Sequence, residues 1–250
     1  MKRALVIIPT YNERENVEAI SKAVLRASGE VDILFVDDHS PDGTGDLLDR
    51  LSASEPRLHV LHHGDKAGLG RAYVAGFQWA LRRGYEFVFE MDADFSHNPD
   101  DVPKLLEAAE SADLVLGSRY VGGIRVINWP LNRLILSKGA AVYVRLITGM
   151  PFTDPTGGFK CYRRAVLQDI PLEQIRSNGY SFQVEMTHTA WMRGFRIVEV
   201  PITFEERRSG QSKMSSAIVH EALLMVWKLL LRSGFRRSPR GAALRKGARS

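Results

Sequence analysis

Two carboxylates, one residue apart, stand at a point of the chain where they could bind a metal ion. Asp92 and Asp94 follow directly after the apolar run 87–91, which has the composition of a buried strand. Carboxylate oxygens are ligands that Mg²⁺ and Mn²⁺ prefer, and such a cation can neutralise a diphosphate. A D-x-D pattern also occurs in solvated acidic turns, so the position at a strand end is what favours a metal site here.

A second acidic pair, Asp37 and Asp38, ends another apolar run and precedes the turn-forming stretch 40–44. A carboxylate at a strand end can accept hydrogen bonds from a ribose or from the N–H groups of a base. The same acids can instead cap the helix that follows. These residues alone leave both interpretations open.

Basic residues that could bind phosphate occur among Gly, Ser and Asn residues: Arg119, Arg133, Arg207 and Lys213. Arg133 and Ser137 are four residues apart, which on a helix places a guanidinium and a hydroxyl on one face, where they can clamp a phosphate monoester. Any one of these basic side chains can also be ordinary solvated charge.

Signatures of several other enzyme classes do not occur in the sequence. The first apolar run leads into PTYN at 9–12 rather than into G-x-G-x-x-G, and there is no Walker sequence. We interpret GLG at 68–70 as a turn entering a helix. The histidines show no metal-ligand spacing and are interpreted as unrelated to one another. A dinucleotide-dependent oxidoreductase is therefore disfavoured.

Short apolar runs alternate with helical patterns, which predicts an α/β fold with a mostly parallel sheet and helices on both faces. Ligands bind such sheets at the carboxyl ends of the strands, where the acidic pairs and the segment 10–13 fall. Beyond residue 125 we expect a long helix, a glycine-rich stretch, a strand at 197–200 and a closing amphipathic helix. The other predicted strands are 5–8, 33–36, 58–61, 87–91 and 114–116, and the other predicted helices are 15–27, 46–51, 71–83 and 101–109.

The composition is that of a folded protein, since 44% of the 250 residues are hydrophobic and 25% are charged. A single cysteine excludes an internal disulfide framework and fits a reducing cytoplasm. Residues 232–250 carry seven basic side chains and no acidic one, and taking these from the net +5 leaves −2 for the rest. We expect one domain over 1–232 and a basic, disordered tail over 233–250 that is attracted to anionic surfaces. The low charge of the body argues against a nucleic-acid-binding module.

Two apolar stretches, 134–147 and 217–231, are interrupted by charged residues and fall short of the ~20 apolar residues that span a bilayer. We therefore expect no transmembrane domain. The stretches can lie in a membrane interface or form a hydrophobic cleft, and the alternative is ordinary core packing.

Taken together, six motifs between about residues 4 and 215 resemble the family 2 glycosyltransferases with the GT-A fold, above all the dolichol-phosphate and polyprenol-phosphate mannose synthases. Several long motifs in the same order are more specific than D-x-D alone. The motifs are VIIPTYNEREN at 6–16, VDDHSPDGT at 36–44, MDADFSH at 91–97, GSRY at 117–120, DPTGGFK at 154–160 and RRSGQSK at 207–213.

The resemblance implies a role for each of these motifs. Asp94 would be the principal ligand of a divalent cation, Mg²⁺ or Mn²⁺, with Asp92 as a further ligand, whereas Ser96 replaces a glutamine that binds metal in some relatives. His39 stands where relatives commonly have a small residue. Arg119 would contact phosphate, and Arg133 with Ser137 would receive the acceptor phosphate. The donor nucleotide would be bound by Pro9, Tyr11, Glu13, Val36, Asp38, Asp92, Ala93, Asp94, Arg119, Arg207 and Lys213.

The reaction implied by the resemblance is the transfer of mannose from GDP-mannose to a dolichyl or polyprenyl phosphate, with inversion at the anomeric carbon. An acceptor phosphate is already ionised near neutral pH, so positioning and charge can carry the catalysis. The enzyme would lie peripherally at the cytoplasmic face of a membrane, with or without a membrane-anchoring subunit, and would bind no nucleic acid. The alternatives are UDP-glucose or a UDP-N-acetylhexosamine as donor, and a nucleotidyltransferase that makes the activated sugar.

Overall fold

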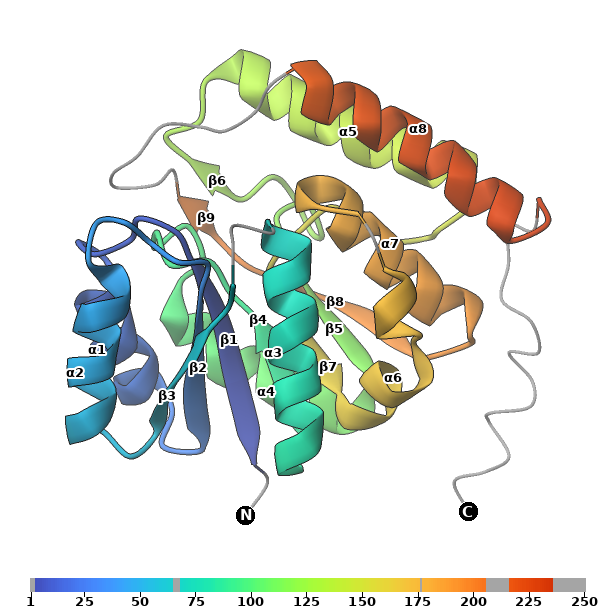
Figure 1. Ribbon diagram of the computed structural model, residues 1–250. Coiled ribbons are helices and arrows are strands. Elements are labelled where there is room, and N and C mark those ends of the chain that lie inside the picture. Colours follow the sequence, from blue (N-terminus) through green and yellow to red (C-terminus); the bar gives the residue numbers. More distant parts are fainter. Residues whose placement is uncertain (1–2, 65–67, 176, 206–215, 236–250) are drawn as a thin grey trace.

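The computed structural model describes residues 3–64, 68–175, 177–205 and 216–235 of the chain (Figure 1). Its strands are β1 (Ala4–Thr10), β2 (Val31–Asp37), β3 (Leu58–His62), β4 (Phe87–Glu90), β5 (Leu114–Ser118), β6 (Val126–Ile127), β7 (Lys160–Arg163), β8 (Ile197–Pro201) and β9 (Phe204–Glu205). Its α-helices are α1 (Val17–Ala27), α2 (Thr44–Ser54), α3 (Leu69–Arg83), α4 (Val102–Ser111), α5 (Leu131–Thr148), α6 (Arg164–Asp169), α7 (Gly179–Met192) and α8 (Ser216–Arg232), and two 3₁₀ turns are η1 (Pro99–Asp101) and η2 (Leu172–Gln174).

A seven-stranded sheet in the order β3-β2-β1-β4-β7-β5-β8 forms the centre of the molecule. All neighbouring pairs are parallel except those of β7, which runs antiparallel to both β4 and β5. The strand order reverses at β1, because β2 lies on one side of it and β4 on the other. In sheets of this kind, a crevice for ligands opens at the carboxyl ends of the strands at such a reversal.

Alternation along the strands sends side chains to two separate cores, one on each face of the sheet. In β1, Leu5 and Ile7 join one core with residues of α3 and α7. Val6 and Ile8, the neighbours of Ile7, join the other core with residues of α1 and α4. Burial on both faces explains why the strands have continuous apolar sequences, and it confirms the mostly parallel sheet covered by helices on both sides.

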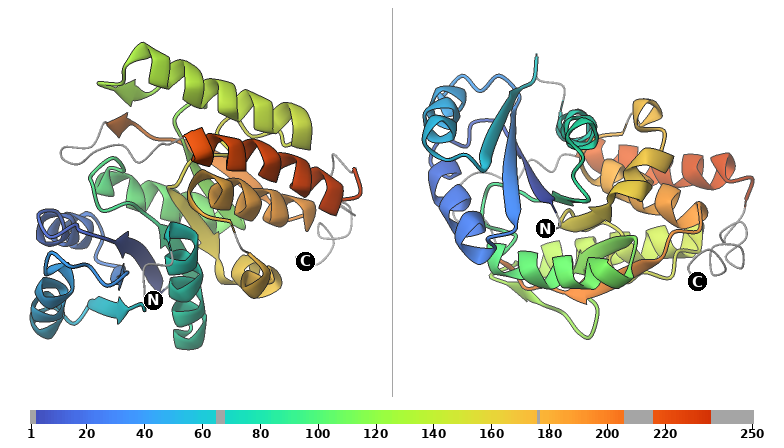
Figure 2. Two further views of the ribbon diagram at one scale, coloured as in Figure 1. Left: turned by 45° about the horizontal axis from the view of Figure 1, so that its top comes forward. Right: turned by 90° about the horizontal axis from the view of Figure 1, so that it is seen from below.

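Helices α5 and α8 lie side by side on the α7 side of the sheet (Figures 1 and 2). The hydroxyl of Tyr143 in α5 donates to the backbone oxygen of Leu223 in α8, at 3.3 Å. Arg232 near the end of α8 forms an ion pair with the buried Glu185 of α7, with 2.9 Å between nitrogen and oxygen. Within the described part of the chain, no helix is both long enough and apolar enough to cross a bilayer.

The sequence located the first five strands and the first four helices within a few residues, since β1 to β5 and α1 to α4 each overlap the range predicted for that element. The strand predicted at 197–200 is β8. It missed β7, which lies inside the sheet between β4 and β5, because only a glycine-rich stretch was predicted there. It also missed α6 and α7. Helix α7 has almost no amphipathic pattern, because it is buried on most of its circumference.

Candidate active site

A pocket of about 380 Å³ opens at the carboxyl ends of β1 and β4, where the strand order reverses. Most of the sequence-predicted site residues that the structure describes meet there. Its lining includes Pro9, Tyr11, Glu13, Asp38, Asp92, Ala93, Asp94, Ser96, Arg119 and Arg133.

The two acids after β2 have different surroundings. Asp37 accepts hydrogen bonds from the hydroxyl of Thr10 at 3.1 Å and from that of Ser40 at 2.5 Å, so it stabilises the turn. Asp38 lines the pocket, and His63 and the N–H of Gly68 bind its two oxygens at 2.9 and 3.2 Å. Both acids are buried. Asp38 is therefore held in one orientation toward the pocket.

Two interpretations change with these contacts. Gly68 is more than a turn residue, because its N–H orients Asp38 and its backbone φ of 90° lies in the region that favours glycine. His63 also takes part in the site, through the same carboxylate. The histidines are thus not all unrelated to one another and to function.

The acids after β4 lie on a tight turn at the pocket. The N–H of Ser96 donates to Asp94 at 3.1 Å, and the N–H of Asp92 donates to the ring of His97 at 3.1 Å. His97 is buried and stacks on Phe159, and burial lowers the pKa of its ring despite the charge of Asp92. A neutral His97 can accept the backbone hydrogen bond and so fixes the loop.

This acidic turn fits a hard divalent cation that is shared with a substrate. Asp92 and Asp94 offer carboxylate oxygens, and the hydroxyl oxygen of Ser96 is buried with no hydrogen-bond partner among the described residues. No group of three or more His, Cys, Asp or Glu suited to a metal occurs in the described ranges. Few protein ligands suit Mg²⁺ and Mn²⁺, since phosphate oxygens and water complete their coordination.

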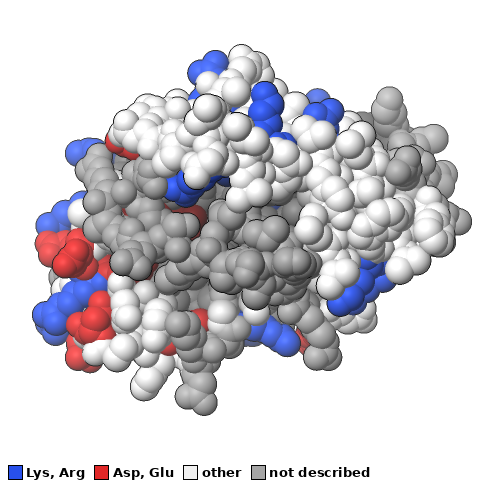
Figure 3. Space-filling model, turned by 90° about the horizontal axis from the view of Figure 1, so that it is seen from above, with Lys and Arg blue, Asp and Glu red and all other residues white. Residues whose placement is uncertain are grey.

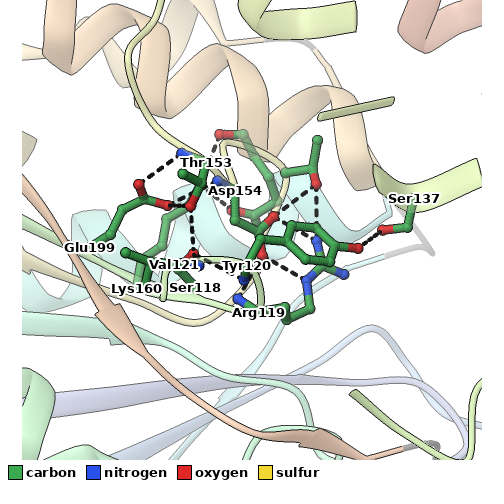
Figure 4. Close-up of polar contacts among 11 residues, drawn as sticks. Ser118, Arg119, Tyr120, Val121, Ser137, Thr153, Asp154, Lys160 and Glu199 are labelled. Carbon is green, nitrogen blue, oxygen red and sulfur yellow. Dashed lines mark hydrogen bonds and ion pairs between the residues drawn. The ribbon is translucent and has the colours of Figure 1, made fainter. Parts of the chain in front are cut away.

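Arg119 is the centre of a buried polar cluster at the wall of the pocket (Figure 4). Its Nε and Nη2 donate to the two oxygens of Asp154, each at 2.7 Å, and Nη2 also donates to Thr156 at 3.0 Å. Burial acts to raise the pKa of Asp154, but the charge and hydrogen bonds of Arg119 outweigh it and hold the pKa below its ordinary value. Asp154 is in turn held through its N–H by Glu199 of β8, at 2.9 Å.

The guanidinium of Arg119 is therefore held in one position, with Nε and Nη2 bound to the protein. Its carbon lies 5.7 Å from the ring centre of Trp129 and 5.6 Å from that of Phe204. Because Asp154 balances its charge, Arg119 offers the pocket a guanidinium in a fixed position rather than an unpaired positive charge.

Arg133 and Ser137 lie on α5, one turn apart, as the spacing predicts. Arg133 lines the pocket and lies over the ring of Trp129, with 4.3 Å to its centre. The hydroxyl of Ser137 accepts a hydrogen bond from Tyr120 at 2.8 Å. The helix thus places a second guanidinium at the rim of the same pocket as the acids.

Four predicted residues are not placed in the pocket. Ser137 is hydrogen-bonded to Tyr120 and is not part of the lining. Val36 is completely buried in the core on the α3 side of the sheet, and its side chain is not part of the lining. Arg207 and Lys213 lie outside the described residues.

Sequence reasoning missed several lining residues: His97, Thr156, Gly158, Tyr180, Gln183 and Phe204. Thr156 and Gly158 belong to a motif that was recognised at 154–160, so their signal was present but unassigned. Tyr180 and Gln183 come from α7, a helix that was not predicted at all.

Comparison with known proteins identifies the family. The sequence model of the family glycosyl transferase family 2 matches residues 5–171, about two thirds of the chain. The chain belongs to glycosyltransferase family 2. The matched residues include the acids after β1, β2 and β4, together with Arg119 and Asp154, and the match ends before α7.

Three curated relatives of this transferase are similar over most of its length. A polyprenol monophosphomannose synthase of Mycolicibacterium smegmatis is 53% identical over 227 residues, 90% of this chain and 86% of the relative. An undecaprenyl-phosphate mannosyltransferase of Micrococcus luteus is 51% identical over 232 residues, 92% and 96% of the two chains. A dolichol-phosphate mannosyltransferase of Pyrococcus furiosus is 37% identical, over 90% of this chain and 63% of the relative.

Solved structures confirm the GT-A fold of the transferase. Glucosyl-3-phosphoglycerate synthase from Mycobacterium tuberculosis, in complex with Mn²⁺, uridine diphosphate and phosphoglyceric acid, superposes with a TM-score of 0.68 at 17% identity. The match covers 96% of this chain and 80% of the other. At that identity the likeness concerns the fold.

Proposed function

We propose that the transferase moves mannose from GDP-mannose to a dolichyl or polyprenyl phosphate. The observation that carries this proposal is the composition of the pocket at the carboxyl ends of β1 and β4, which brings the acids after β2 and β4 together with Arg119 and Arg133. Acids at the strand ends suit a nucleotide diphosphate with its cation, and the arginines suit a second, anionic substrate. The names of the three mannosyltransferase relatives support mannose and a polyprenyl phosphate.

The bond changes need no strong base. An oxygen of the acceptor phosphate, already ionised near neutral pH, attacks the anomeric carbon of mannose while the bond from that carbon to the β-phosphate of GDP breaks. GDP leaves with the electron pair, and a β-linked mannosyl phosphate forms by inversion. Arg133 at the rim offsets the repulsion between the two anionic substrates, and the guanidinium of Arg119, paired with Asp154, adds a group of fixed position to the wall beside them.

Asp38 favours guanine over uracil in this proposal. The carboxylate has about four lone-pair positions, and His63 and the N–H of Gly68 use one on each oxygen. A guanine edge offers two parallel N–H donors to the remaining positions, whereas uracil offers one. Two bonds to a buried carboxylate bind the base more strongly than one. UDP-glucose or a UDP-N-acetylhexosamine is the alternative donor.

A divalent cation, Mg²⁺ or Mn²⁺, would be held by Asp94, with Asp92 and Ser96 beside it. When bound, it neutralises charge on the departing diphosphate. The structural neighbour glucosyl-3-phosphoglycerate synthase was crystallised with Mn²⁺, which supports this assignment. Arg207 and Lys213 remain proposed as phosphate-binding residues on the resemblance alone.

The surface of α5 and α8 is proposed to meet the membrane that holds the acceptor, at its cytoplasmic face. Seen from this side, the described surface is largely uncharged, and acidic side chains gather at its left edge (Figure 3). Large apolar side chains stay exposed on α5 and α8 and just after α8, which is unusual without a partner. They are Leu131, Ile135, Leu136, Val142, Leu146, Leu223, Leu224, Trp227, Leu231 and Phe235.

We place the catalytic domain at 1–232 and assign electrostatic attraction to the basic tail, 233–250. Anionic headgroups attract basic segments by about 1 kcal/mol per charge near the surface. Binding to anionic liposomes should weaken with salt and on deletion of residues 233–250. Binding that is independent of salt and of the deletion would refute the role of the tail. A membrane-anchoring subunit would be revealed by transfer that requires added membrane protein.

A matched donor assay tests the proposed activity. The purified chain is incubated with a polyprenyl phosphate in detergent, Mg²⁺ or Mn²⁺, and radiolabelled GDP-mannose, UDP-glucose or UDP-N-acetylglucosamine. Label should pass into the lipid phase from GDP-mannose, and Asp94→Ala should abolish the transfer. Asp100→Ala, which removes an exposed carboxylate nearby, is the matched control and should retain it.

Each other outcome has a definite meaning. Transfer from a UDP-sugar alone would refute the donor. No transfer from any donor by a folded protein, with and without added membrane protein, would refute the activity. In a separate assay with a nucleoside triphosphate and a sugar 1-phosphate, release of pyrophosphate would indicate the nucleotidyltransferase alternative. An α-linked product in the NMR spectrum would refute inversion.

A further inference from the structure

The amide of Gln183 in α7 lines the active-site pocket, and its orientation is fixed from behind. Gln183 is 4% exposed. The ammonium of Lys160, the first residue of β7, donates to the backbone oxygen of Gln183 at 2.8 Å and to its Oε1 at 2.6 Å. Because an ammonium only donates, the oxygen of the amide must face Lys160. The NH₂ group has two N–H bonds: one donates to the carboxylate of Glu90, and the second is left to donate elsewhere.

That NH₂ group lies at the wall of the pocket beside Gly158. A Cβ atom built on Gly158 would be 3.7 Å from Nε2 of Gln183 and 3.5 Å from Cε1 of His97. Gly158, Gln183 and His97 all line the pocket. The absence of a side chain at Gly158 therefore leaves room at this wall for a ligand to reach the second N–H of the amide.

The lysine that fixes the amide is expensive to bury. Lys160 is completely buried, and desolvation lowers its pKa to about 8 despite the nearby charge of Glu90. Glu90 is also completely buried and accepts a hydrogen bond from Tyr162 at 3.0 Å. Apolar residues of similar volume usually fill a core at lower free-energy cost. A network of this kind is explained if it serves to hold a ligand-binding group in place.

The order of the strands indicates which part of the donor meets Gln183. Asp38 follows β2 and the Asp92–Asp94 turn follows β4, while Lys160 belongs to β7, the next strand beyond β4. A donor with its base at Asp38 and its diphosphate at the acidic turn therefore directs its sugar toward β7. An uncharged amide suits sugar hydroxyls, since it adds no charge beside the diphosphate.

We propose that Gln183 recognises the donor sugar by donating a hydrogen bond from Nε2 to a sugar hydroxyl, and that Lys160 is the residue that positions it. This inference rests on the proposed use of a nucleoside diphosphate sugar and adds the contact that selects the sugar. A site that donates to a particular hydroxyl discriminates against sugars that place it differently.

The test separates sugar binding from nucleotide binding. Titration calorimetry of Gln183→Met with GDP and with GDP-mannose should show unchanged affinity for GDP and about fivefold to tenfold weaker affinity for GDP-mannose, as expected for one lost neutral hydrogen bond. Lys160→Met should give a smaller loss of the same kind, because the amide remains but is no longer held. Ser181→Ala, which alters another buried polar residue of α7 outside the pocket, should change neither affinity.

Gln183→Glu provides a second variant that keeps an oxygen-bearing side chain for Lys160 and removes the NH₂ group. It should also lose affinity for GDP-mannose alone, and it should discriminate less between GDP-mannose and GDP-glucose in the transfer assay. Equal binding of GDP-mannose by the wild type and both variants, or parallel loss of GDP and GDP-mannose binding, would overturn the inference. If the wild type neither binds nor uses GDP-mannose, the proposed function itself fails.

Discussion

Replacing Asp154 by Asn should destabilise the transferase strongly, because it removes the charge that neutralises a buried guanidinium. Arg119 is 4% exposed and Asp154 is 0% exposed. Their two hydrogen bonds of 2.7 Å form a bidentate pair, and Asp154 also accepts from the N–H of Arg119 at 3.0 Å. Asn keeps the shape of the side chain but offers one oxygen in place of two and no charge.

The magnitude follows from the burial of both partners. Removing one member of a buried ion pair typically costs about 3–5 kcal/mol, because the other charge is left uncompensated. For a chain of this size, about 2–4 °C of Tm is lost per kcal/mol, so Asp154→Asn should melt roughly 6–20 °C lower. The double variant Arg119→Met, Asp154→Leu should lose less stability than the sum of the losses in the single variants Arg119→Met and Asp154→Leu, since the double variant leaves no unpaired charge of this pair.

Urea unfolding followed by circular dichroism, with calorimetry for Tm, measures these changes. Glu18→Gln breaks an exposed ion pair with Lys22 and serves as the control, which should show no measurable change. A loss of less than about 1 kcal/mol for Asp154→Asn, or full additivity in the double variant, would refute the reasoning that the pair neutralises a buried charge.

Three further predictions concern other parts of the structure. Burial lowers the pKa of His188 from 6.5 to about 4, so on acidification the unfolded chain binds a proton at this residue before the folded chain does. The free energy of unfolding should therefore fall between about pH 6.5 and pH 4, by up to about 3 kcal/mol. Urea unfolding across this pH range should show a smaller fall for His188→Leu. In Gly70→Ala, the new Cβ would lie 2.3 Å from the backbone oxygen of Ser177, so the start of α3 must shift. Urea unfolding should show a loss of about 1–3 kcal/mol of stability. Calorimetry should show weaker binding of GDP, because the shift also moves Gly68, whose N–H orients Asp38. Trp227 is 47% exposed on α8, and Trp227→Glu should reduce co-sedimentation with liposomes while leaving calorimetric GDP binding unchanged.

Each of these predictions has a result that would contradict it. For His188, the wild type and the variant would lose stability equally on acidification. For Gly70, the alanine variant would match the wild type in both stability and GDP binding. For Trp227, the glutamate variant would sediment with liposomes as fully as the wild type does.

Much of the site could be predicted because its residues are close in sequence to the strands that carry them. Asp92 and Asp94 follow β4 directly, and Asp38 follows β2, so predicting a parallel sheet was enough to bring them to one edge. The position of Arg133 and Ser137 on one helix followed from their spacing. The family motifs then supplied their roles.

The partners of these residues could not be predicted in the same way. Asp154 binds Arg119 from a loop 35 residues away, and Lys160 meets Gln183 across 23 residues. Neither pair has a local pattern, since both depend on β7 entering the sheet between β4 and β5 in the antiparallel direction. Sequence periodicity describes one element at a time and contains no information on which elements become neighbours.

By itself, the sequence therefore determined the alternating elements, the acidic strand ends and the family to which they belong, because strand and helix periodicities and the family motifs are local. Only the tertiary structure decided that Arg119 is held by a buried carboxylate, that His63 orients Asp38, and that Gln183 of α7 lines the pocket. Those contacts form when the chain packs, since burial and hydrogen bonding between distant segments depend on the complete sheet and the helices that cover it.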